Sequence, residues 1–572
     1  MTKYIFVTGG VISGVGKGIA SASIGRILKE YGYSITIIKV DPYLNCDAGT
    51  LRPTEHGEVW ITDDGGETDQ DLGNYERFLD QSIPKINNIT TGQVYKEVID
   101  KERKGLFLGQ TVQFIPHIPN EIKSRIKKAG EGYDIVIVEI GGTVGDYENI
   151  PFLFAIKSLE DEVGKNNIVN ILVTYLPIPS HIEEMKTKPT QISVKLLREN
   201  NIEPDFIICR GKRALDDVRK KKIEIYSHVA SENVISSPDL IGEGTINTIY
   251  GAPINLMKEF LGEKILKKLN LEGRKKPNWD KWERLLFKIK NPSNEVKVGI
   301  IGKYFDIGDY QLKDSYISIN EALVHCSAHH EVKINVEFLD SKEIERNSDL
   351  LNHKRLDGII IPGGFGSSGV EGKINAIKFA RENNIPFLGL CYGMQLAVIE
   401  FARNVCNLKD AHTTEINPNT SNPVIDILPE QKVIFDKGGT MRLGAHKAQI
   451  IGKVRDLYKK DFVYERHRHR YEVNPYYHDI IKSNGLIFSG MSEDKKLVEF
   501  IELPLHPFFI ATQAHPEFKS SLMNPSPLFM GFIEACLKKS EMIDDKNEFI
   551  STSSKVQSQF QKEEFQKLNE DI

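Results

Sequence analysis

The sequence is poor in cysteine, lacks long apolar segments and has no excess of positive charge. Its six cysteines are scattered over 572 residues without a CxxC pair, which argues against a disulfide-rich secreted fold and a structural zinc site. No apolar run approaches the roughly 18 residues that cross a bilayer, and a strand-like start at Tyr4 leaves no room for a signal peptide. The net charge of −5 argues against a general nucleic-acid binder. We expect a cytoplasmic protein with no membrane or nucleic-acid partner.

The sequence does contain a repeated strand and helix pattern, which predicts an α/β fold with two doubly wound parallel-sheet domains. A chain of this length exceeds what one hydrophobic core holds. Continuous β-branched segments are typical of strands buried on both faces of a parallel sheet. In the first half these segments lie at residues 34–41, 134–142, 170–176 and 205–209, and in the second half they begin at residues 297, 356, 386 and 508.

Changes in composition indicate the domain boundaries. Over residues 269–294 the apolar periodicity is lost and the sequence becomes basic and polar, which is typical of a connection between domains. From about residue 540 the chain is rich in Ser, Gln and Lys. We expect a first domain over 1–268, a linker over 269–294, a second domain over 295–540 and a polar, disordered tail over 541–572.

The segment from Tyr4 to Gly18 has the order of a phosphate-binding loop. Glycines and Lys17 follow a strand-length apolar run, so backbone N–H groups at a helix N-terminus can cradle a polyphosphate. The alternative is a glycine-rich turn in an ordinary strand–helix unit. Gly18 stands where Ser or Thr would hold magnesium, so the metal would need carboxylates from elsewhere. Asp71 and Glu139 are reasonable ligands, because magnesium prefers hard oxygen donors.

Several further polar residues stand at the ends of expected strands. Ligands bind outside the carboxyl ends of strands in such sheets, so we expect the loop, Asp41, Glu139 and Arg210 to share one crevice. Residues 186–191 place two lysines and an amide around a proline, which suits a second polyphosphate. An ordinary exposed loop is the alternative for that segment.

In the second half, Cys391 follows a short apolar strand and precedes a helix-compatible segment, which indicates a nucleophile elbow. A thiol beside a helix N-terminus gains thiolate character. His515 and Glu517 are two residues apart after another strand, so they share a face on which Glu517 can orient the imidazole that serves Cys391. The glycines of residues 362–366 can offer N–H groups to an oxyanion. Each feature alone is more simply explained by packing, but together and in this order they favour a site with a nucleophilic cysteine.

The run at residues 465–471, which contains Arg466, Arg468 and Arg470, is ambiguous on its own. It could be a solvated basic face, a nucleic-acid patch or a weak metal site. We favour a pocket that recognises carboxylates, because planar guanidinium groups bind them bidentately and the acidic total disfavours nucleic acid.

With these motifs in hand, the chain resembles the CTP synthase family of glutamine-dependent amidoligases from residue 4 to about 538. The motifs that support the resemblance are GGVISGVGKG at 9–18, KVDPY at 39–43, HGEV at 56–59, DLGNYER at 71–77, EIGGTVGD at 139–146, KTKPTQ at 186–191, GTMRLG at 439–444 and RHRHRY at 466–471. The resemblance implies ATP-dependent amination of UTP to CTP through a 4-phospho-UTP intermediate, with ammonia released from glutamine and passed internally.

The resemblance also implies a role for particular residues. Cys391, His515 and Glu517 would be catalytic, with Gly363, Gly364 and Tyr392 at the oxyanion, and Gly364, Gln395, Glu415 and Arg470 would bind glutamine. ATP would contact Ser13, Gly14, Val15, Gly16, Lys17, Gly18, Ile19, Lys39, Asp71 and Arg210, with Mg²⁺ on Asp71 and Glu139. UTP, or CTP as feedback inhibitor, would contact Ser13, Asp146, Tyr147, Glu148, Lys186, Thr187, Lys188, Pro189, Thr190, Gln191 and Lys222.

The expectations about regulation and assembly rest on the resemblance alone. It implies a homotetramer, a family tendency to form filaments, and GTP as an allosteric activator. Ser368 stands where family members usually have an Arg associated with the GTP response, which leaves GTP activation open. One alternative is an amidoligase with an acceptor other than UTP, and residues 186–191 argue against it. The other is a non-catalytic regulatory or filament-forming protein, which the presence of Cys391, His515, Lys17 and Asp71 argues against.

Overall fold

The computed structural model describes residues 1–52, 56–181, 184–242, 247–303, 313–427 and 441–542. Within these ranges no helix is both long enough and apolar enough to cross a lipid bilayer. The expected tail over 541–572 lies outside the described residues from position 543 onward. All six cysteines are described, all are free thiols, and five of them are buried, in agreement with the prediction that no disulfide forms.

The first half of the chain forms a seven-stranded sheet with the strand order β5-β2-β6-β1-β7-β8-β9. Every pairing in this sheet is parallel, as predicted. The strands are apolar along almost their whole length because both faces are covered. Their bounds are β1 (Lys3–Gly9), β2 (Ile35–Asp41), β5 (Asn88–Thr90), β6 (Ile135–Ile140), β7 (Ile168–Tyr175), β8 (Phe206–Gly211) and β9 (Val234–Pro238).

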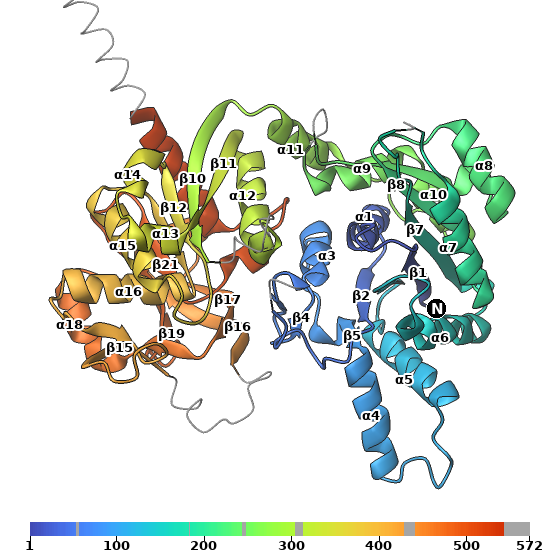
Figure 1. Cartoon of the computed structure of the whole chain (residues 1–572), viewed down its shortest axis with the longest axis horizontal. Helices are drawn as coiled ribbons and strands as arrows, with labels where there is room; N and C mark the ends of the chain where they lie inside the picture. The colour runs from blue at the N-terminus through green and yellow to red at the C-terminus, as the bar shows by residue number, and fades with distance from the viewer. Residues whose placement is uncertain (53–55, 182–183, 243–246, 304–312, 428–440, 543–572) are drawn as a thin grey trace, which may run out of the picture.

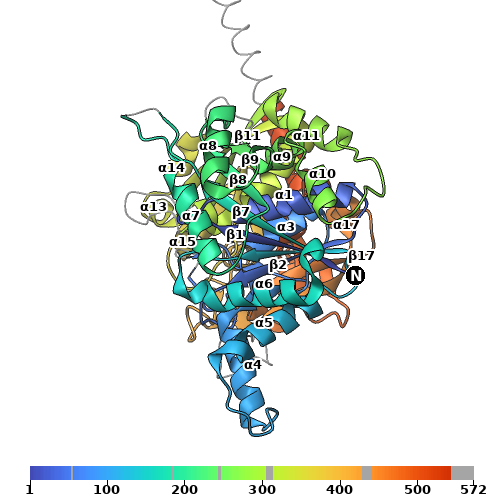
Figure 2. The same cartoon turned by 90° about the vertical axis from the view of Figure 1, so that its right-hand side faces the viewer.

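Helices cover both faces of the first sheet, and alternate residues of β1 show the two layers. Ile5 and Val7 pack into one core with α1, α3 and α9, whereas Tyr4 and Phe6 pack into the other with α5, α6 and α7. Figure 2 shows α5, α6 and α7 in front of the sheet, and α4 projecting beyond it. The helices are α1 (Lys17–Glu30), α3 (Asp71–Leu79), α4 (Thr91–Arg103), α5 (Phe114–Ala129), α6 (Ile150–Val163), α7 (Lys188–Glu199), α8 (Asp217–Ser227), α9 (Ala252–Lys258) and α10 (Leu261–Lys268).

The second half forms a nine-stranded sheet with the order β11-β10-β12-β13-β21-β20-β19-β16-β17. The first five strands in this order are parallel, as predicted, but β20, β19, β16 and β17 continue the sheet antiparallel. These four strands and the parallel edge strand β11 were not predicted. β11, β16, β17 and β19 mix buried and partly exposed residues, whereas β20 is buried throughout. The bounds are β10 (Asn294–Gly302), β11 (Val332–Asp340), β12 (Gly358–Ile361), β13 (Phe387–Leu390), β16 (Arg442–Ile450), β17 (Phe462–His469), β19 (Ile487–Ser492), β20 (Val498–Glu502) and β21 (Phe509–Thr512).

The second sheet is also covered on both faces. Ile359 and Ile361 pack with α15 and α16, whereas Ile360 packs with α12 and a final helix over residues 527–542. A small sheet of β14 (Ala411–Thr413), β15 (Asn422–Ile427) and β18 (Tyr471–Val473) lies beside it. The helices are α12 (Ile317–His330), α13 (Ser341–Arg346), α14 (Leu350–Lys354), α15 (Val370–Glu382), α16 (Tyr392–Asn404), α17 (Gly452–Tyr458) and α18 (His478–Ser483).

The connection between the two halves contains a helix that the sequence analysis did not predict. Helix α11 (Asp280–Lys290) lies in the expected linker and bridges the two halves in Figure 1. Trp282, Leu285 and Leu286 of this helix are buried in the core of the first half, and the Trp282 indole donates a hydrogen bond to the carbonyl of Tyr250 at 2.9 Å. The apolar side of this short helix is therefore fixed to the first half.

Arginines of β17 join the two halves directly. Arg466 Nε lies 2.7 Å from Asp63 Oδ1, and its Nη2 lies 2.7 Å from Glu76 Oε2. Two residues along the strand, Arg468 Nε lies 2.8 Å from Glu67 Oε1. The run at 465–471 does bind carboxylates, as the favoured interpretation expected. The carboxylates bound by Arg466 and Arg468, however, belong to the first half of the same chain. The acidic loop at residues 63–73 is consequently part of an interface.

The buried Arg466 pair should make a large contribution to stability. We expect Arg466→Met to lower the free energy of unfolding by about 3–5 kcal/mol, because it leaves the buried Glu76 carboxylate without its cation. The measurement is thermal or urea unfolding followed by tryptophan fluorescence, since the Arg466 guanidinium lies 5.3 Å from the ring of Trp60.

Arg455→Met is the matched control. Its ion pair with Asp461 joins side chains that are 58% and 77% exposed, so its loss should cost under about 1 kcal/mol. Equal effects of the two substitutions would contradict the assignment of Arg466 as the residue that holds the halves together.

Candidate active sites

Cys391 lies between β13 and α16 in a strained backbone conformation. Its φ of 49° and ψ of −98° are unusual for a residue other than glycine, and its amide donates to the Thr512 carbonyl at 2.7 Å. A Cβ at Gly393 would lie 2.2 Å from the Ile361 carbonyl oxygen, so the turn needs glycine there. The side chain of Cys391 is thus presented at the N-terminus of a helix, the geometry of a nucleophile elbow.

His515 and Glu517 come from the segment that follows β21 and meet Cys391. His515 Nδ1 lies 2.7 Å from Glu517 Oε1, and the imidazole lines the same cavity as Cys391, close enough for the thiol to affect its pKa. Burial lowers the pKa of His515, but Glu517 and Cys391 outweigh it and raise the pKa to about 10. The imidazole is therefore held as a cation between a carboxylate and a thiol, an arrangement suited to thiolate chemistry.

The residues expected around the nucleophile are close to it. A Cβ at Gly363 would lie 2.8 Å from His515 Cε1 and 3.7 Å from Cys391 Cβ, so this glycine leaves the space free for a substrate atom. Tyr392 begins α16, and its backbone is at the helix N-terminus beside Gly363 and Gly364. These three positions can offer N–H groups to a developing oxyanion.

The expected glutamine-binding residues line the neighbouring elements. The Gln395 amide nitrogen donates to the Tyr471 carbonyl at 3.0 Å, while its Oε1 is buried and has no hydrogen-bond partner among the described residues. Glu415 Oε1 accepts the Gly366 amide at 2.9 Å. Arg470 lies between β17 and β18 and, like Glu415, is close enough to Tyr471 to affect its pKa. These groups can bind an amino acid by its charged ends.

A cavity of about 240 Å³ opens from the Cys391 site toward the first half of the chain. On one side it is lined by Cys391, His515, Glu517 and Gly363, and on the other by residues 49, 51, 58 and 59. Arg468, which pairs with Glu67, also lines it. The arginine contacts between the halves thus border the cavity that Cys391 lines.

In the first half, the phosphate loop has the conformation that its glycines predicted. Gly14 and Gly16 have φ of 69° and 82°, in the left-handed region that favours glycine. Gly16 precedes α1, and Lys17 Nζ donates to the Gly142 carbonyl at 2.6 Å. Burial lowers the pKa of Lys17. The loop from Ser13 to Gly16, in which Ser13 and Gly14 are exposed and Val15 is buried, therefore leads into the N-terminus of α1.

Acidic residues gather around Lys39 at the end of β2. Its Nζ pairs with Asp71 and lies 3.2 Å from Glu139 Oε1 and 3.8 Å from Asp41 Oδ1. Burial acts to lower the pKa of Lys39, but these carboxylates raise it well above its usual value. The strand ends that we expected in one crevice do meet, because Lys39 and Glu139 are register partners in adjacent strands.

The position of Asp71 explains the unusual glycine of the loop. A Cβ at Gly18 would lie 2.2 Å from Asp71 Oδ1, so the carboxylate occupies the place of the missing Ser or Thr side chain. Among the described residues, no three His, Cys, Asp or Glu side chains form a ready metal cluster. Asp71 and Glu139 fit magnesium as a pair of oxygen ligands, since this ion usually completes its shell with phosphate and water.

The segment expected to bind UTP lies against the phosphate loop. Thr187 precedes α7, and Pro189, Thr190 and Gln191 form its first turn. The Val11 amide donates to Ser193 Oγ at 3.1 Å, which attaches this turn to the loop. Lys186 lies just before the turn, where it pairs with Glu184 at 2.7 Å, and Lys188 is the first residue of α7.

The expected nucleotide residues Asp146 to Glu148 lie near the phosphate loop, whereas Lys222 does not. Asp146 Oδ2 accepts the Thr143 amide at 2.6 Å, and the 3-10 turn Tyr147–Asn149 follows it, close to the glycines that Lys17 contacts. Lys222, by contrast, is an exposed residue of α8, and its link to the set is an electrostatic effect on Glu184. The structure therefore places Lys222 apart from the other nucleotide residues.

A cavity of about 320 Å³ adjoins the phosphate loop on the side of Arg210. Gly14, Gly16, Ile19 and Arg210 line it together with apolar residues such as Tyr175. Arg210 is fixed by Asp239, with Nη2 at 2.7 Å from Oδ1. A cavity with apolar walls beside a phosphate loop can accept the base and sugar of a nucleotide.

Sequence reasoning missed several residues of these sites. Tyr75 hydrogen-bonds Glu139 Oε2, and Asp69 lies 3.9 Å from Lys39 Nζ. The i, i+4 spacing of Asp71 and Tyr75 on α3 could have placed Tyr75 on the same face. The partnership of Asp239 with Arg210 has no local sequence signal, because 29 residues separate the two.

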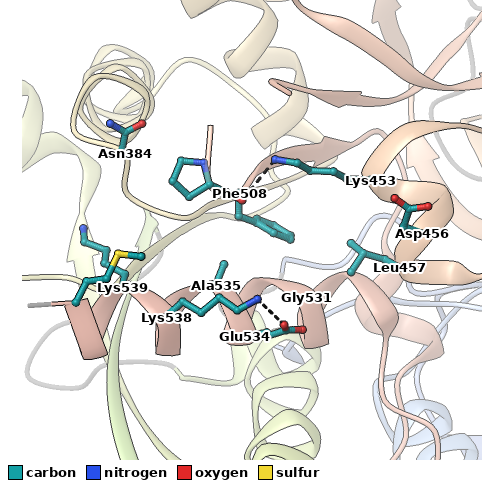
Figure 3. A pocket seen from close by; sticks show the side chains of 12 residues that line it. Asn384, Lys453, Asp456, Leu457, Phe508, Gly531, Glu534, Ala535, Lys538 and Lys539 are labelled. Atoms are coloured by element: carbon teal, nitrogen blue, oxygen red, sulfur yellow. Dashed lines mark hydrogen bonds and ion pairs between the residues drawn. The ribbon is translucent and has the colours of Figure 1, made fainter. Parts of the chain in front are cut away.

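The largest described cavity lies far from this chemistry. It measures about 510 Å³ and is bounded by the helix over 527–542, by Phe508 and by Leu457 of α17 (Figure 3). Lys453 and Lys538 line it, but Lys453 donates to the His506 carbonyl and Lys538 pairs with Glu534. None of the expected site residues belongs to it.

Two family models divide the chain between them. Residues 3–271 match the CTP synthase N-terminus, and residues 311–535 match the class-I glutamine amidotransferase. The chain therefore combines an amidoligase half with a glutamine amidotransferase half.

Whole-length relatives specify the family. The CTP synthase of Methanocaldococcus jannaschii is 55% identical over 543 residues, which cover 94% of this chain and 98% of the relative. That of Pyrococcus abyssi is 52% identical over 538 residues, with the same coverage. A solved glutaminase domain of Trypanosoma brucei CTPS with bound acivicin is 37% identical, with a TM-score of 0.39, and covers 42% of this chain and 94% of that domain.

The chain belongs to the CTP synthase family. It is accordingly a ligase of pyrimidine biosynthesis that converts UTP to CTP with glutamine and ATP as co-substrates.

The raised pKa of His515 leads to a test of its partner Glu517. In Glu517→Gln the imidazole loses the carboxylate that raises its pKa, so the thiolate–imidazolium pair should be lost at a lower pH. We expect glutaminase turnover to fall by about 10²- to 10⁴-fold, as for the equivalent change in a serine-protease triad. The alkaline limb of its pH profile, measured as glutamate release, should move to lower pH.

The control for this variant is CTP synthesis from ammonium, which does not use the glutaminase site. That activity should be retained in Glu517→Gln. An alkaline limb that stays at the wild-type pH would contradict the role of Glu517.

Proposed function

We propose that the chain makes CTP at two separate sites joined by an internal passage. Glutamine is hydrolysed at Cys391, UTP is phosphorylated on its 4-oxygen beside the phosphate loop, and ammonia moves between the sites without entering the solvent. The observation that supports this proposal best is the cavity between the halves, which is lined both by Cys391 and by residues 51, 58 and 59 of the first half.

At the glutaminase site the roles follow from the contacts. Cys391 attacks the glutamine amide carbon, and His515 transfers a proton to the departing nitrogen, which leaves as ammonia. Glu517 orients the imidazole and stabilises its charge. The oxyanion is stabilised by N–H groups at Gly363, Gly364 and Tyr392. Gln395, Glu415 and Arg470 hold the amino and carboxyl groups of the substrate.

At the first site the phosphate loop receives ATP. Residues 13–19 cradle its phosphates, Lys17 and Lys39 supply positive charge, and the cavity beside Arg210 takes the nucleoside. Magnesium, when held by Asp71 and Glu139, would neutralise phosphate charge. UTP is held by Lys186–Gln191, without the distant Lys222, and Asp146, Tyr147 and Glu148 would face the ring of CTP, the feedback inhibitor. Phosphorylation converts the 4-oxygen of UTP into a good leaving group for ammonia to displace.

The segment at residues 56–59 supports a continuous route between the sites. Glu58 and Val59 line the cavity at Cys391. His56 contacts the ring of Tyr43 at a centroid distance of 6.3 Å, and Tyr43 in turn hydrogen-bonds Asp41 at 3.3 Å. This short segment therefore borders both the glutaminase cavity and the acidic cluster around Lys39.

We propose a homotetramer as the functional assembly, with filaments as a higher form. The arm made by α4, α5 and the residues between them extends from the body of the first half (Figures 1 and 2). It exposes apolar side chains, among them Leu106 at 61%, Leu108 at 91% and Phe114 at 49%. Exposed apolar residues that cluster in this way are typical of contacts between chains.

Two reciprocal variants test the division of labour. Cys391→Ala should abolish glutamine-dependent CTP synthesis but leave synthesis from ammonium, because only the nitrogen source is lost. Asp71→Asn should abolish CTP synthesis from both nitrogen sources while glutamate release persists, because only the ATP site is damaged. The measurement is CTP formation from UTP and MgATP with either glutamine or ammonium, together with glutamate release.

Wild-type protein supplies the control. Product from both nitrogen sources is expected. A folded wild-type chain that makes CTP from neither source, or a Cys391→Ala variant that loses both activities equally, would refute the two-site proposal.

GTP is the proposed activator of the glutaminase half, and Ser368 allows a test of it. Ser368 is exposed on the loop before α15. We expect GTP to raise glutamine-dependent synthesis in Ser368→Arg by more than it does in the wild type, since a guanidinium binds phosphate groups bidentately. Ser367→Arg is the matched control one residue away. An equal GTP response in all three proteins would contradict a role for position 368.

A further inference from the structure

A carboxylate lies where the glutaminase cavity meets the first half of the chain. Glu58 lines the same cavity as Cys391 and His515. It belongs to the segment just before β3 (Trp60–Ile61), so it comes from the half opposite the thiol. No part of the glutamine or nucleotide chemistry described above uses it.

The contacts of Glu58 hold it in place without neutralising it. Its Oε2 accepts hydrogen bonds from the amide of Ser318 at 3.0 Å and from the Ser318 hydroxyl. Arg77 Nη2 donates to Ser318 Oγ at 2.7 Å, so the guanidinium is linked to the carboxylate through a serine. A desolvated carboxylate is costly unless it is paired or has a ligand.

A second acceptor stands nearby. Glu517 uses Oε1 for His515, whereas its Oε2 is buried and has no hydrogen-bond partner among the described residues. Glu58 and Glu517 line the same cavity from opposite halves of the chain, and the charge of Glu517 helps to raise the pKa of Glu58. Two carboxylates in one cavity, one of them with an unused buried oxygen, can accept hydrogen bonds from a small molecule that has several N–H groups.

We propose that Glu58 is a positioning residue that receives the released ammonia between its carboxylate and Glu517 Oε2. This inference rests on the proposed internal transfer. Ammonia donates N–H bonds to the two carboxylates and keeps its lone pair directed away from them. No bond is made or broken at this stage. Holding ammonia at the boundary between the halves limits its return to the glutaminase site and its escape.

Glu58 should act in its ionised form, because a carboxylate accepts from N–H groups at both oxygens. Burial raises its pKa from the usual 4.5 to about 7, with a further increase from Glu517, while Ser318 and Arg77 oppose the shift. The other charged groups that line the cavity are His515, held as a cation, and Arg468, paired with Glu67. Ammonia transfer should therefore weaken as the pH falls through about 7.

The test measures coupling, defined as CTP formed per glutamate released, in the full-length protein. In Glu58→Gln, which keeps the shape of the side chain, coupling should fall by about three- to tenfold, which is within the range for the loss of a typical hydrogen bond. Glutamate release and CTP synthesis from saturating ammonium should stay within about twofold of wild type. Retained synthesis from ammonium also shows that the variant is folded.

Glu321→Gln is the matched control. Glu321 is also a carboxyl with a raised pKa near Arg77, and it hydrogen-bonds Tyr250, but it does not line the cavity. Its substitution should leave coupling unchanged. An equal loss of coupling in both variants would assign the effect to packing at the interface and overturn the proposal.

The pH profile separates positioning from a structural role. Wild-type coupling should decline below about pH 7, whereas coupling in Glu58→Gln should be low and independent of pH. Ser318→Ala removes a hydrogen bond that lowers the pKa of Glu58, so the decline should move to higher pH. Normal, pH-dependent coupling in Glu58→Gln would refute the proposal for Glu58 alone. Absence of CTP from ammonium in the wild type would instead refute the two-site function.

Discussion

The ion pairs between Arg466, Asp63 and Glu76 are the interaction on which the rest of the molecule depends. Each half has its own sheet, and one hydrophobic core extends across the boundary, because Ala328, Phe518 and Leu522 of the second half pack into the core of the first. The arginines of β17 hold the acidic loop of the first half beside the glutaminase site, where residues of both halves line the cavity in front of Cys391. A buried ion pair adds little net stability, but it strongly restricts how the two elements that carry it can be arranged. Its main effect here is to fix the relative position of two catalytic sites.

Carboxylates are used in three different ways, according to their surroundings. The pKa of Asp63 is lowered to about 2 because Arg466 and other partners outweigh its burial. Around Lys39 burial raises the pKa of Glu139 but the ammonium lowers that of Asp71, which keeps charge available for a metal and phosphates. Glu58 has only neutral donors in direct contact, and its pKa rises to about 7. The same functional group thus serves as an interface contact, a ligand and a titratable acceptor.

Local patterns in the sequence were sufficient to predict the parallel part of both sheets and the position of the chemistry. Continuous apolar runs identified β1, β2, β6 to β8, β10, β12, β13 and β21, because strands covered on both faces have a strong signal. The parallel strands β5, β9 and β11, the four antiparallel strands and α11 were missed. In α11, β11, β16, β17 and β19 the mixture of buried and partly exposed residues makes the pattern weaker. For Arg466 and Arg468 the type of partner was predicted, but the carboxylates lie about 400 residues away in the chain, beyond the reach of any local pattern.

The sequence by itself determined the fold class, the family and the residue types of each site, because glycine-dependent turns and strand-end residues are encoded within a few positions of each other. Only the tertiary structure decided what meets across the two halves. It placed Asp71 in the space left by Gly18, joined the basic run to the acidic loop, and brought Glu58 beside Glu517 in one cavity. These pairings depend on how two separately folded sheets pack together. That packing is set by shape and charge over the whole interface, which no single stretch of sequence contains.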